Sequence, residues 1–128
     1  MITLSVSIDV PSLEEGIRFY ADAFGLTKVS EPYPGVVILR AGESELLLLQ
    51  KLPGSAPSQF TDDRRHYHRH WTPIHIDFHV DDFRSSLEKA VAAGAKQEQL
   101  LATPGRPSVA FCSDPFGHGF CIIERGRR

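Results

Sequence analysis

The chain has 128 residues, enough for one domain with a buried core, and 41% hydrophobic and 23% charged residues are ordinary for a globular protein. The formal net charge of -2 argues against a general polyanion binder, so we expect no nucleic-acid partner. No segment approaches the roughly 18 apolar residues that cross a bilayer, no signal peptide is recognisable, and two cysteines suit a reduced, cytoplasmic setting.

The first predicted elements are a strand and a helix. Residues 2–10 alternate between apolar and polar side chains, which is the period of a half-buried strand. Ser12 followed by Glu15 forms a capping-box signature, so a helix is expected to begin there. The helix should run to about Phe24, because Gly25 supplies a C-terminal stop.

Three strands and a long connection complete the first half. The strands are expected at 27–30, 36–40 and 45–51, separated by turns that contain proline or glycine. Residues 53–72 have no clean periodicity and contain prolines, glycine and charges. A connection of this length in a compact domain is typical of a lid or of a linker between two units.

The second half repeats the first. The segment 75–83 has the same pattern as 5–13, namely an alternating run, a polar cap residue and a helix, and such repetition indicates duplicated units. It predicts a strand at 74–80 and a helix capped by Asp82 and stopped by Gly94. Three strands are expected after it, near 96–100, at 108–113 and at 119–124.

Several segments carry a family resemblance through their order and spacing. They are Asp9-Val-Pro-Ser-Leu13 leading into Arg18-Phe19-Tyr20, Phe24-Gly25-Leu26, His75-Ile-Asp-Phe-His-Val-Asp-Asp82 and Ser113-Asp-Pro-Phe-Gly-His118. The sequence resembles the vicinal oxygen chelate (VOC) superfamily, which includes glyoxalase I, extradiol dioxygenases and bleomycin resistance proteins. The resemblance implies an α+β fold of one domain over residues 1–128, in which the curled mixed sheets of two βαβββ modules enclose a cavity. The modules would span about 1–52 and 73–128, with a linker at about 53–72, and a homodimer is expected.

The resemblance also implies a metal site of four positions, in the first and last strand of each module, which usually carry His, Gln or Glu. Here they fall on Ser5, Leu47, His75 and Cys121. Because only His75 is an unambiguous ligand, we expect no metal cofactor at the usual site. A register slip would instead turn Glu124 or Gln50 inward beside His75 and give a site for Zn, Ni, Fe or Mn.

The strand after the linker carries an unusual polar face. Every second residue of this strand is polar, namely His75, Asp77 and His79, so these side chains share one face and form a second candidate ligand set. Neighbours on the same face of a strand are about 6.5–7 Å apart, so the side chains would have to converge on a single ion. The alternative is a hydrogen-bonded pair of His75 and Asp77 that lines a cavity, where the imidazole could act as general acid or base. Ser113 and Asp114 are expected to stabilise their own turn.

The end of the linker combines histidines, arginines and aromatic residues. It contains Tyr67 and the only tryptophan, Trp71, which are costly to expose, so this segment is expected to cover a cavity or to pack in an interface. Arg64, Arg65 and Arg69 are either solvated or, if the loop overhangs the cavity, favour an anionic or neutral ligand.

The predicted function is that of a glyoxalase/bleomycin-resistance-like protein that binds a small molecule in its inter-module cavity without the usual metal. The cavity wall would contain Ser5, Ser7, Asp9, Trp71, His75, Asp77, His79 and Cys121. One alternative is a divalent-metal-dependent glyoxalase-type lyase or isomerase that uses His75 as a ligand. Another is metal-free acid–base catalysis by His75 with Asp77 or Asp9. Whether the protein is an enzyme stays open, and extradiol dioxygenase chemistry is disfavoured because its iron needs two histidines and a carboxylate.

Overall fold

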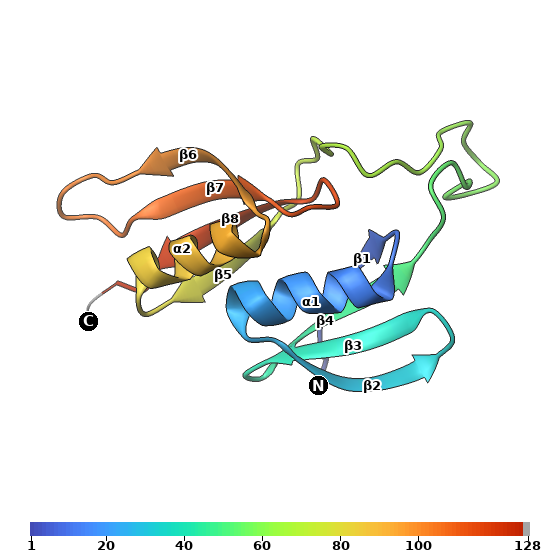
Figure 1. Cartoon of the computed structure of the whole chain (residues 1–128), viewed down its shortest axis with the longest axis horizontal. Helices are drawn as coiled ribbons and strands as arrows, with labels where there is room; N and C mark the ends of the chain where they lie inside the picture. Colours follow the sequence, from blue (N-terminus) through green and yellow to red (C-terminus); the bar gives the residue numbers. More distant parts are fainter. Residues whose placement is uncertain (127–128) are drawn as a thin grey trace. The chain divides into compact units, whose positions relative to one another are not determined.

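The computed structural model describes residues 1–126 and separates into two compact units. The first consists of residues 1–21 and 25–67, and the second of residues 22–24 and the chain from His68 onward. The order β-α-β-β-β occurs twice, and each copy has a four-stranded mixed sheet (Figure 1). The α+β class and the two repeated modules are therefore confirmed. No helix in the described part of the chain is long and apolar enough to cross a membrane.

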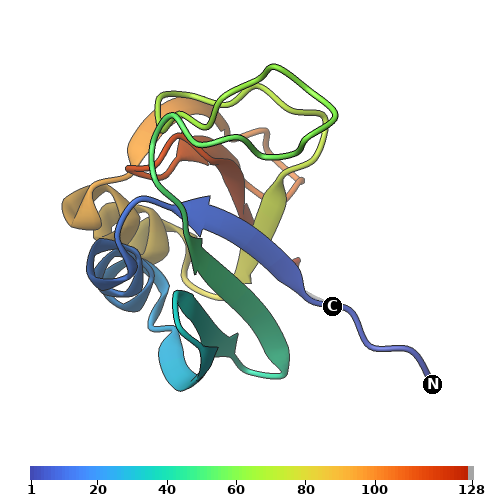
Figure 2. The same ribbon diagram turned by 90° about the vertical axis from the view of Figure 1, so that its right-hand side faces the viewer.

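The sheet of the first unit has the order β1-β4-β3-β2. Its strands are β1 (Val6–Val10), β2 (Thr27–Tyr33), β3 (Val36–Ala41) and β4 (Ser44–Gln50). Strands β1 and β4 run parallel and lie side by side (Figure 2), whereas the other pairs are antiparallel. Two expectations were wrong in extent: β1 begins at Val6 instead of residue 2, and β2 continues through Pro32, which an edge strand tolerates.

Helix α1 (Leu13–Phe24) begins and ends where the sequence predicts. The Ser12 hydroxyl accepts a backbone N–H of the first turn at 3.3 Å, and Gly25 takes the left-handed conformation that ends the helix, with φ of 70°. The helix packs closely on its sheet at Gly16, where a Cβ atom would lie only 2.9 Å from Cδ1 of Leu48. The absence of a side chain at Gly16 thus permits the helix–sheet contact.

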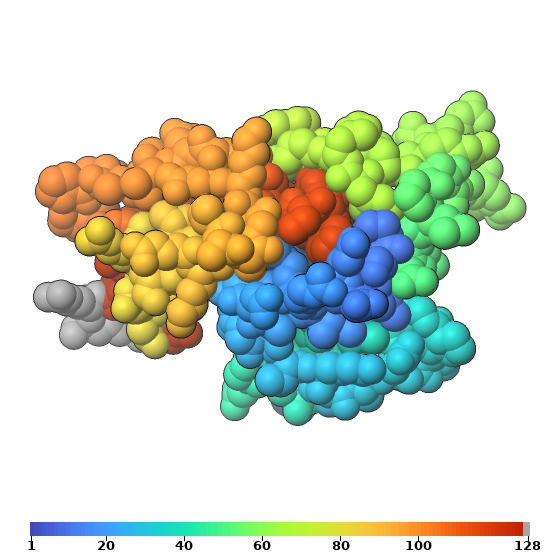
Figure 3. Space-filling view, in the orientation of Figure 1, coloured from blue at the N-terminus to red at the C-terminus, as the bar shows by residue number. Residues whose placement is uncertain are grey.

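The second unit repeats this arrangement with the sheet order β5-β8-β7-β6. Its strands are β5 (Ile76–Val80), β6 (Lys96–Leu101), β7 (Val109–Ser113) and β8 (Gly119–Glu124). Strands β5 and β8 are parallel and the remaining pairs antiparallel. Helix α2 (Phe83–Ala93) contacts β8, and its outer side forms part of the surface in Figure 3.

Strand β5 begins two residues later than predicted, so Ile74 and His75 precede it. The Thr72 hydroxyl donates to the carbonyl of Ile74 at 2.6 Å, which engages this carbonyl before the strand ladder starts. The caps of α2 are confirmed: the Asp82 side chain accepts the first-turn N–H at 3.0 Å, and Gly94 follows with a positive φ of 123°.

The connection after β4 folds back onto the first unit. The backbone N–H of Gly54 donates to the carbonyl of Arg65 at 2.7 Å, and the N–H of Arg65 donates to the carbonyl of Ser55 at 2.8 Å. The Arg65 guanidinium also forms an ion pair with Asp9 at 2.9 Å. This part of the predicted linker is therefore an ordered loop fixed to β1.

Candidate functional site

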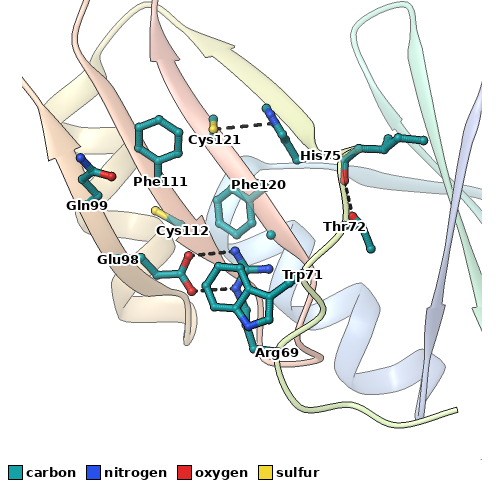
Figure 4. A pocket seen from close by; sticks show the side chains of 12 residues that line it. Arg69, Trp71, Thr72, His75, Glu98, Gln99, Phe111, Cys112, Phe120 and Cys121 are labelled. Carbon is teal, nitrogen blue, oxygen red and sulfur yellow. Dashed lines mark hydrogen bonds and ion pairs between the residues drawn. The ribbon is translucent and has the colours of Figure 1, made fainter.

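A hollow of about 260 Å³ opens on the sheet of the second unit (Figure 4). Its residues come from the segment before β5 and from strands β6, β7 and β8. They are Arg69, Trp71, Thr72, Ile74, His75, Glu98, Gln99, Phe111, Cys112, Gly119, Phe120 and Cys121. Among the residues predicted to line a cavity, Trp71, His75 and Cys121 are brought together here.

Strand register determines which side chains share the sheet face of Cys121. In β8, Cys121 stands opposite Asp77 of β5 and opposite Phe111 of β7. Directly paired residues project to the same side of a sheet, so these three side chains lie on one face. Burial, together with the neighbouring Asp77 carboxylate, raises the pKa of Cys121 to about 11. The thiol is consequently protonated at neutral pH.

His75, Asp77 and Cys121 form a compact group beside this hollow. Nδ1 of His75 lies 2.9 Å from Oδ1 of Asp77 and 3.8 Å from Sγ of Cys121. One donor atom of each residue lies within 4.8 Å of the others. A carboxylate that contacts an imidazole fixes the orientation of the ring, so this pair is suited to holding a ligand or a proton at a defined position.

The opposite wall is an arginine held between an acid and an aromatic ring. Arg69 donates from Nε and Nη2 to the two carboxylate oxygens of Glu98, at 2.7 and 2.9 Å, and its guanidinium carbon lies 3.9 Å above the centre of the Trp71 ring. The bidentate contact raises the pKa of Arg69 and lowers the pKa of Glu98, so both groups stay charged. A Cβ atom on Gly119 would lie 2.7 Å from the guanidinium nitrogens, so a side chain there would displace Arg69.

With this geometry established, comparison with known proteins identifies the family. A family model described as a glyoxalase-like domain matches residues 5–123. The chain belongs to this glyoxalase-like family. The family and the fold place it in the VOC superfamily, as the sequence motifs predict.

Solved structures show the same fold at low sequence identity. A glyoxalase/bleomycin resistance protein/dioxygenase family enzyme from Burkholderia phytofirmans is 21% identical, with a TM-score of 0.71 and coverage of 94% of this chain and 96% of that chain. A lactoylglutathione lyase from Agrobacterium tumefaciens is 20% identical, with a TM-score of 0.66 and coverage of 95% and 92%. A variant of the fosfomycin resistance protein FosX from Listeria monocytogenes, complexed with Mn(II) and dihydroxypropylphosphonic acid, is 13% identical, with a TM-score of 0.72 and coverage of 96% and 90%. No curated protein matches the sequence.

Family membership raises the question of whether the donors present could hold a metal. A tetrahedral ion with donors at about 2.0–2.3 Å requires those donors to lie about 3–4 Å apart. The distances within the group of His75, Asp77 and Cys121 come near this range, so an imidazole, a carboxylate and a sulfur could serve as ligands once the thiol had lost its proton. This donor set differs from the one that the resemblance implies, because it contains sulfur and lies within one unit.

Other candidate ligands of the second unit do not join this group. His79 lies two residues beyond Asp77 on the same side of β5 and is not part of the cluster. Strand β8 pairs in continuous register with both neighbours, without the slip that would turn Glu124 inward. Glu124 therefore lies on the face opposite Cys121, and its Oε1 accepts the N–H of Ser108 at 3.2 Å.

The remaining predicted residues belong to the first unit. Ser5 precedes β1 and borders a separate hollow of the first unit, and Ser7 lies within the strand. The carboxylate of Asp9 is engaged by Arg65. The Gln50 side chain accepts the backbone N–H of the first residue of α1 at 2.9 Å and so supports the helix start.

Sequence patterns alone do not single out Glu98 or Gln99, which line the pocket from β6. A register shift between Gln97 and Gln99 makes Glu98 an extra residue in this strand, and such a bulge changes the direction of neighbouring side chains. The only signal in the sequence is a run of polar residues in an edge strand, which is equally typical of a solvated surface.

The cysteine pair and the last turn fulfil structural roles. Cys112 and Cys121 lie on neighbouring strands as expected, but Cys112 pairs with Phe120, so the two thiols project to opposite faces and both are free. The turn role of Asp114 is confirmed, since this buried carboxylate accepts the backbone N–H groups of Phe116 and His118, each at 2.9 Å.

Proposed function

We propose that this glyoxalase-like protein binds a small organic molecule in the hollow of its second unit, without the usual four-position metal site of the superfamily. The observation that carries the proposal is the combination of aromatic side chains with several converging polar groups around one concavity. Polar groups from His75, Gln99 and Cys121 would orient the ligand, while Trp71 and Phe111 would supply contact area.

The size of the hollow supports a ligand of one substituted ring. Its volume of about 260 Å³ equals roughly nine waters at about 30 Å³ each, and an apolar cavity of about 150 Å³ already accepts benzene. Trp71 is 79% exposed, which is unusual for a large aromatic side chain and leaves most of its surface available for contact. A ligand would cover this surface.

A screen of chemically diverse small molecules by ligand-observed NMR tests the proposal. Compounds that bind the wild-type protein should lose at least about tenfold in affinity with Trp71→Ala, which removes one pocket wall and corresponds to about 1.4 kcal/mol. Phe60→Ala is the matched control, because Phe60 is an 88% exposed aromatic residue outside the pocket. If no compound binds, or if both variants weaken binding equally, the proposal fails.

A second candidate function is a metal-dependent lyase or isomerase, and the convergence of His75, Asp77 and Cys121 favours it. When bound, a divalent ion would act as a Lewis acid that polarises a substrate oxygen. The protein's part would be to hold the ion with these three side chains.

Cobalt substitution separates this candidate from the metal-free protein. If the site forms, Co(II) should give a thiolate charge-transfer absorption that disappears in Cys121→Ser and persists in Cys112→Ser, since Cys112 faces the other side of the sheet. Absence of this band at saturating Co(II), together with substoichiometric zinc in the purified protein, would exclude the three-residue site. Turnover by the metal-free protein would instead support acid–base chemistry by His75 and Asp77.

The cytoplasmic setting and the homodimer stay predictions. Sedimentation equilibrium would test the oligomeric state, and fractionation of the source cells would test the location. Both predictions rest on the composition of the chain and on the superfamily resemblance.

A further inference from the structure

Two of the three linker arginines, Arg65 and Arg69, do not provide free positive charge for a ligand, and Arg64 does not line the hollow. Arg65 forms an ion pair with Asp9 at 2.9 Å, and Arg69 forms a bidentate pair with Glu98. The remaining Nη1 of Arg69 donates to the carbonyl of His70. Of the anionic or neutral ligand expected from the linker arginines, the anionic alternative therefore loses its main support, because the guanidinium groups of Arg65 and Arg69 already have carboxylate partners.

The formal charges around the hollow add up to zero or to a negative value. Arg69 is the one lysine or arginine among the described lining residues, and Glu98 balances it. The adjacent pair of His75 and Asp77 has a net charge of -1 with a neutral imidazole and of zero with a protonated one. A protonated Cys121 thiol adds no charge. An anion in the hollow would lie near the Asp77 carboxylate, which contacts the lining residue His75 and projects from the same sheet face as Cys121. No unpaired lysine or arginine among the described lining residues would compensate for this negative charge.

The uncharged part of the lining suits a flat, apolar ring. Trp71 and Ile74 stand at the hollow with 79% and 82% of their surfaces exposed, and Phe111 lies deeper on the sheet face. The guanidinium of Arg69 stacks on the Trp71 ring and holds the indole in place (Figure 4). A ring that covers these side chains removes apolar surface from water, which favours binding.

We propose that the hollow selects neutral or cationic ring compounds with a hydrogen-bond donor and discriminates against anions. The donor would bind to the Asp77 carboxylate or to the imidazole of His75. This inference rests on the proposed function and adds the charge class of the ligand.

Three compounds with the same ring and nearly the same size test the charge preference. Benzyl alcohol is neutral, benzylamine is cationic and benzoate is anionic near neutral pH. Trp71 is the only tryptophan, so its fluorescence reports directly on the hollow, and ligand-observed NMR provides an independent affinity. We expect benzyl alcohol and benzylamine to bind measurably, and benzoate to bind at least about tenfold more weakly at low ionic strength.

Two variants identify the source of the discrimination. Asp77→Asn removes the uncompensated carboxylate and should bring the benzoate affinity close to that of benzyl alcohol. Glu98→Gln should act in the same direction, because it frees the positive charge of Arg69. Asp81→Asn is the matched control, since this 90% exposed carboxylate follows β5 but does not belong to the group of His75, Asp77 and Cys121, and it should leave the preference unchanged.

Each outcome decides a separate claim. Benzoate binding as tightly as benzyl alcohol would overturn the charge inference while leaving the proposed binding site intact. If none of the three compounds binds but the screen finds other ligands that require Trp71, the charge inference is wrong and the proposed function is still supported. If neither these three compounds nor any screened compound binds, both the charge inference and the proposed function are wrong. A preference that survives in both Asp77→Asn and Glu98→Gln would also overturn the electrostatic explanation.

Discussion

Replacing Arg65 by alanine should destabilise the first unit, because this side chain fixes the long connection to β1. Its guanidinium makes three hydrogen bonds, to the Asp9 carboxylate at 2.9 Å, to the Ser55 hydroxyl at 3.2 Å and to the Ala56 carbonyl at 2.9 Å. The Arg65 side chain is only 18% exposed and that of Asp9 only 33%, so solvent screens the pair incompletely.

The expected loss follows from these contacts. A hydrogen bond to a charged group contributes about 1.5–3 kcal/mol when buried and a neutral one about 1 kcal/mol, and partial exposure reduces the sum. We therefore expect Arg65→Ala to lower the free energy of unfolding by about 2–3 kcal/mol. For a chain of this length, that loss corresponds to a decrease of about 6–15 °C in Tm.

Arg64→Ala provides a control at the neighbouring position. Arg64 is exposed, and its recorded contact is a weak one of 3.4 Å to the carbonyl of the preceding residue, Asp63, so its removal should cost less than about 0.5 kcal/mol. Urea unfolding followed by circular dichroism measures both variants, and limited trypsin digestion reports whether the loop has opened. The reasoning would be refuted if the two variants were equally stable, or if trypsin cleaved the loop in neither variant. The double variant of Arg65→Ala with Asp9→Asn should cost less than the sum of the single changes.

Three further predictions concern packing, a turn and alkaline pH. Gly16→Ala should destabilise the protein by about 1–2 kcal/mol in urea unfolding, because the new Cβ would overlap the buried Leu48 side chain. This loss is expected although alanine has the better helix propensity. A gain in stability would contradict the close helix–sheet packing at Gly16. Asp114→Ala leaves two backbone N–H groups without their acceptor and should cost about 2–4 kcal/mol in thermal melts, with a smaller loss for Asp114→Asn. Burial raises the pKa of Cys112 and of Cys121 from 9.0 to about 11. The two thiols therefore contribute fully to the free energy of unfolding below pH 9, and this contribution is lost as the pH rises through 11. Replacing either cysteine by serine should make the loss of stability between pH 9 and 11 smaller in unfolding experiments.

The helix boundaries were predictable because their chemistry is local. Ser12 and Asp82 accept backbone N–H groups a few residues away, and Gly25 and Gly94 take positive φ values that other residues rarely adopt. Strand ends were less predictable, since a strand continues only as long as its neighbour offers partners. Just before the late start of β5, the Thr72 hydroxyl donates to the carbonyl of Ile74, a contact that no alternation pattern reveals.

The candidate site was predictable only in part. Alternation placed Asp77 on the same strand face as His75, and the superfamily resemblance placed Cys121 at a site position of the last strand. The pocket residue Glu98 depends on a bulge in β6, and a single inserted residue in an edge strand leaves no distinct mark in the sequence. The partner of Arg69 could likewise not be assigned, since several carboxylates in the chain would serve equally well.

The sequence by itself determined the duplicated β-α-β-β-β order, the helix ends and the family, because hydrophobic period, capping and turn chemistry act over a few residues. Only the tertiary structure decided that Arg69 pairs with Glu98, that Asp9 pairs with Arg65, and that His75 contacts Asp77 beside a protonated Cys121 thiol. Most of these contacts join residues separated by tens of positions, so they depend on strand register and loop path. For the same reason the charge of the hollow follows from the pairing of its ionised groups, which composition alone does not specify.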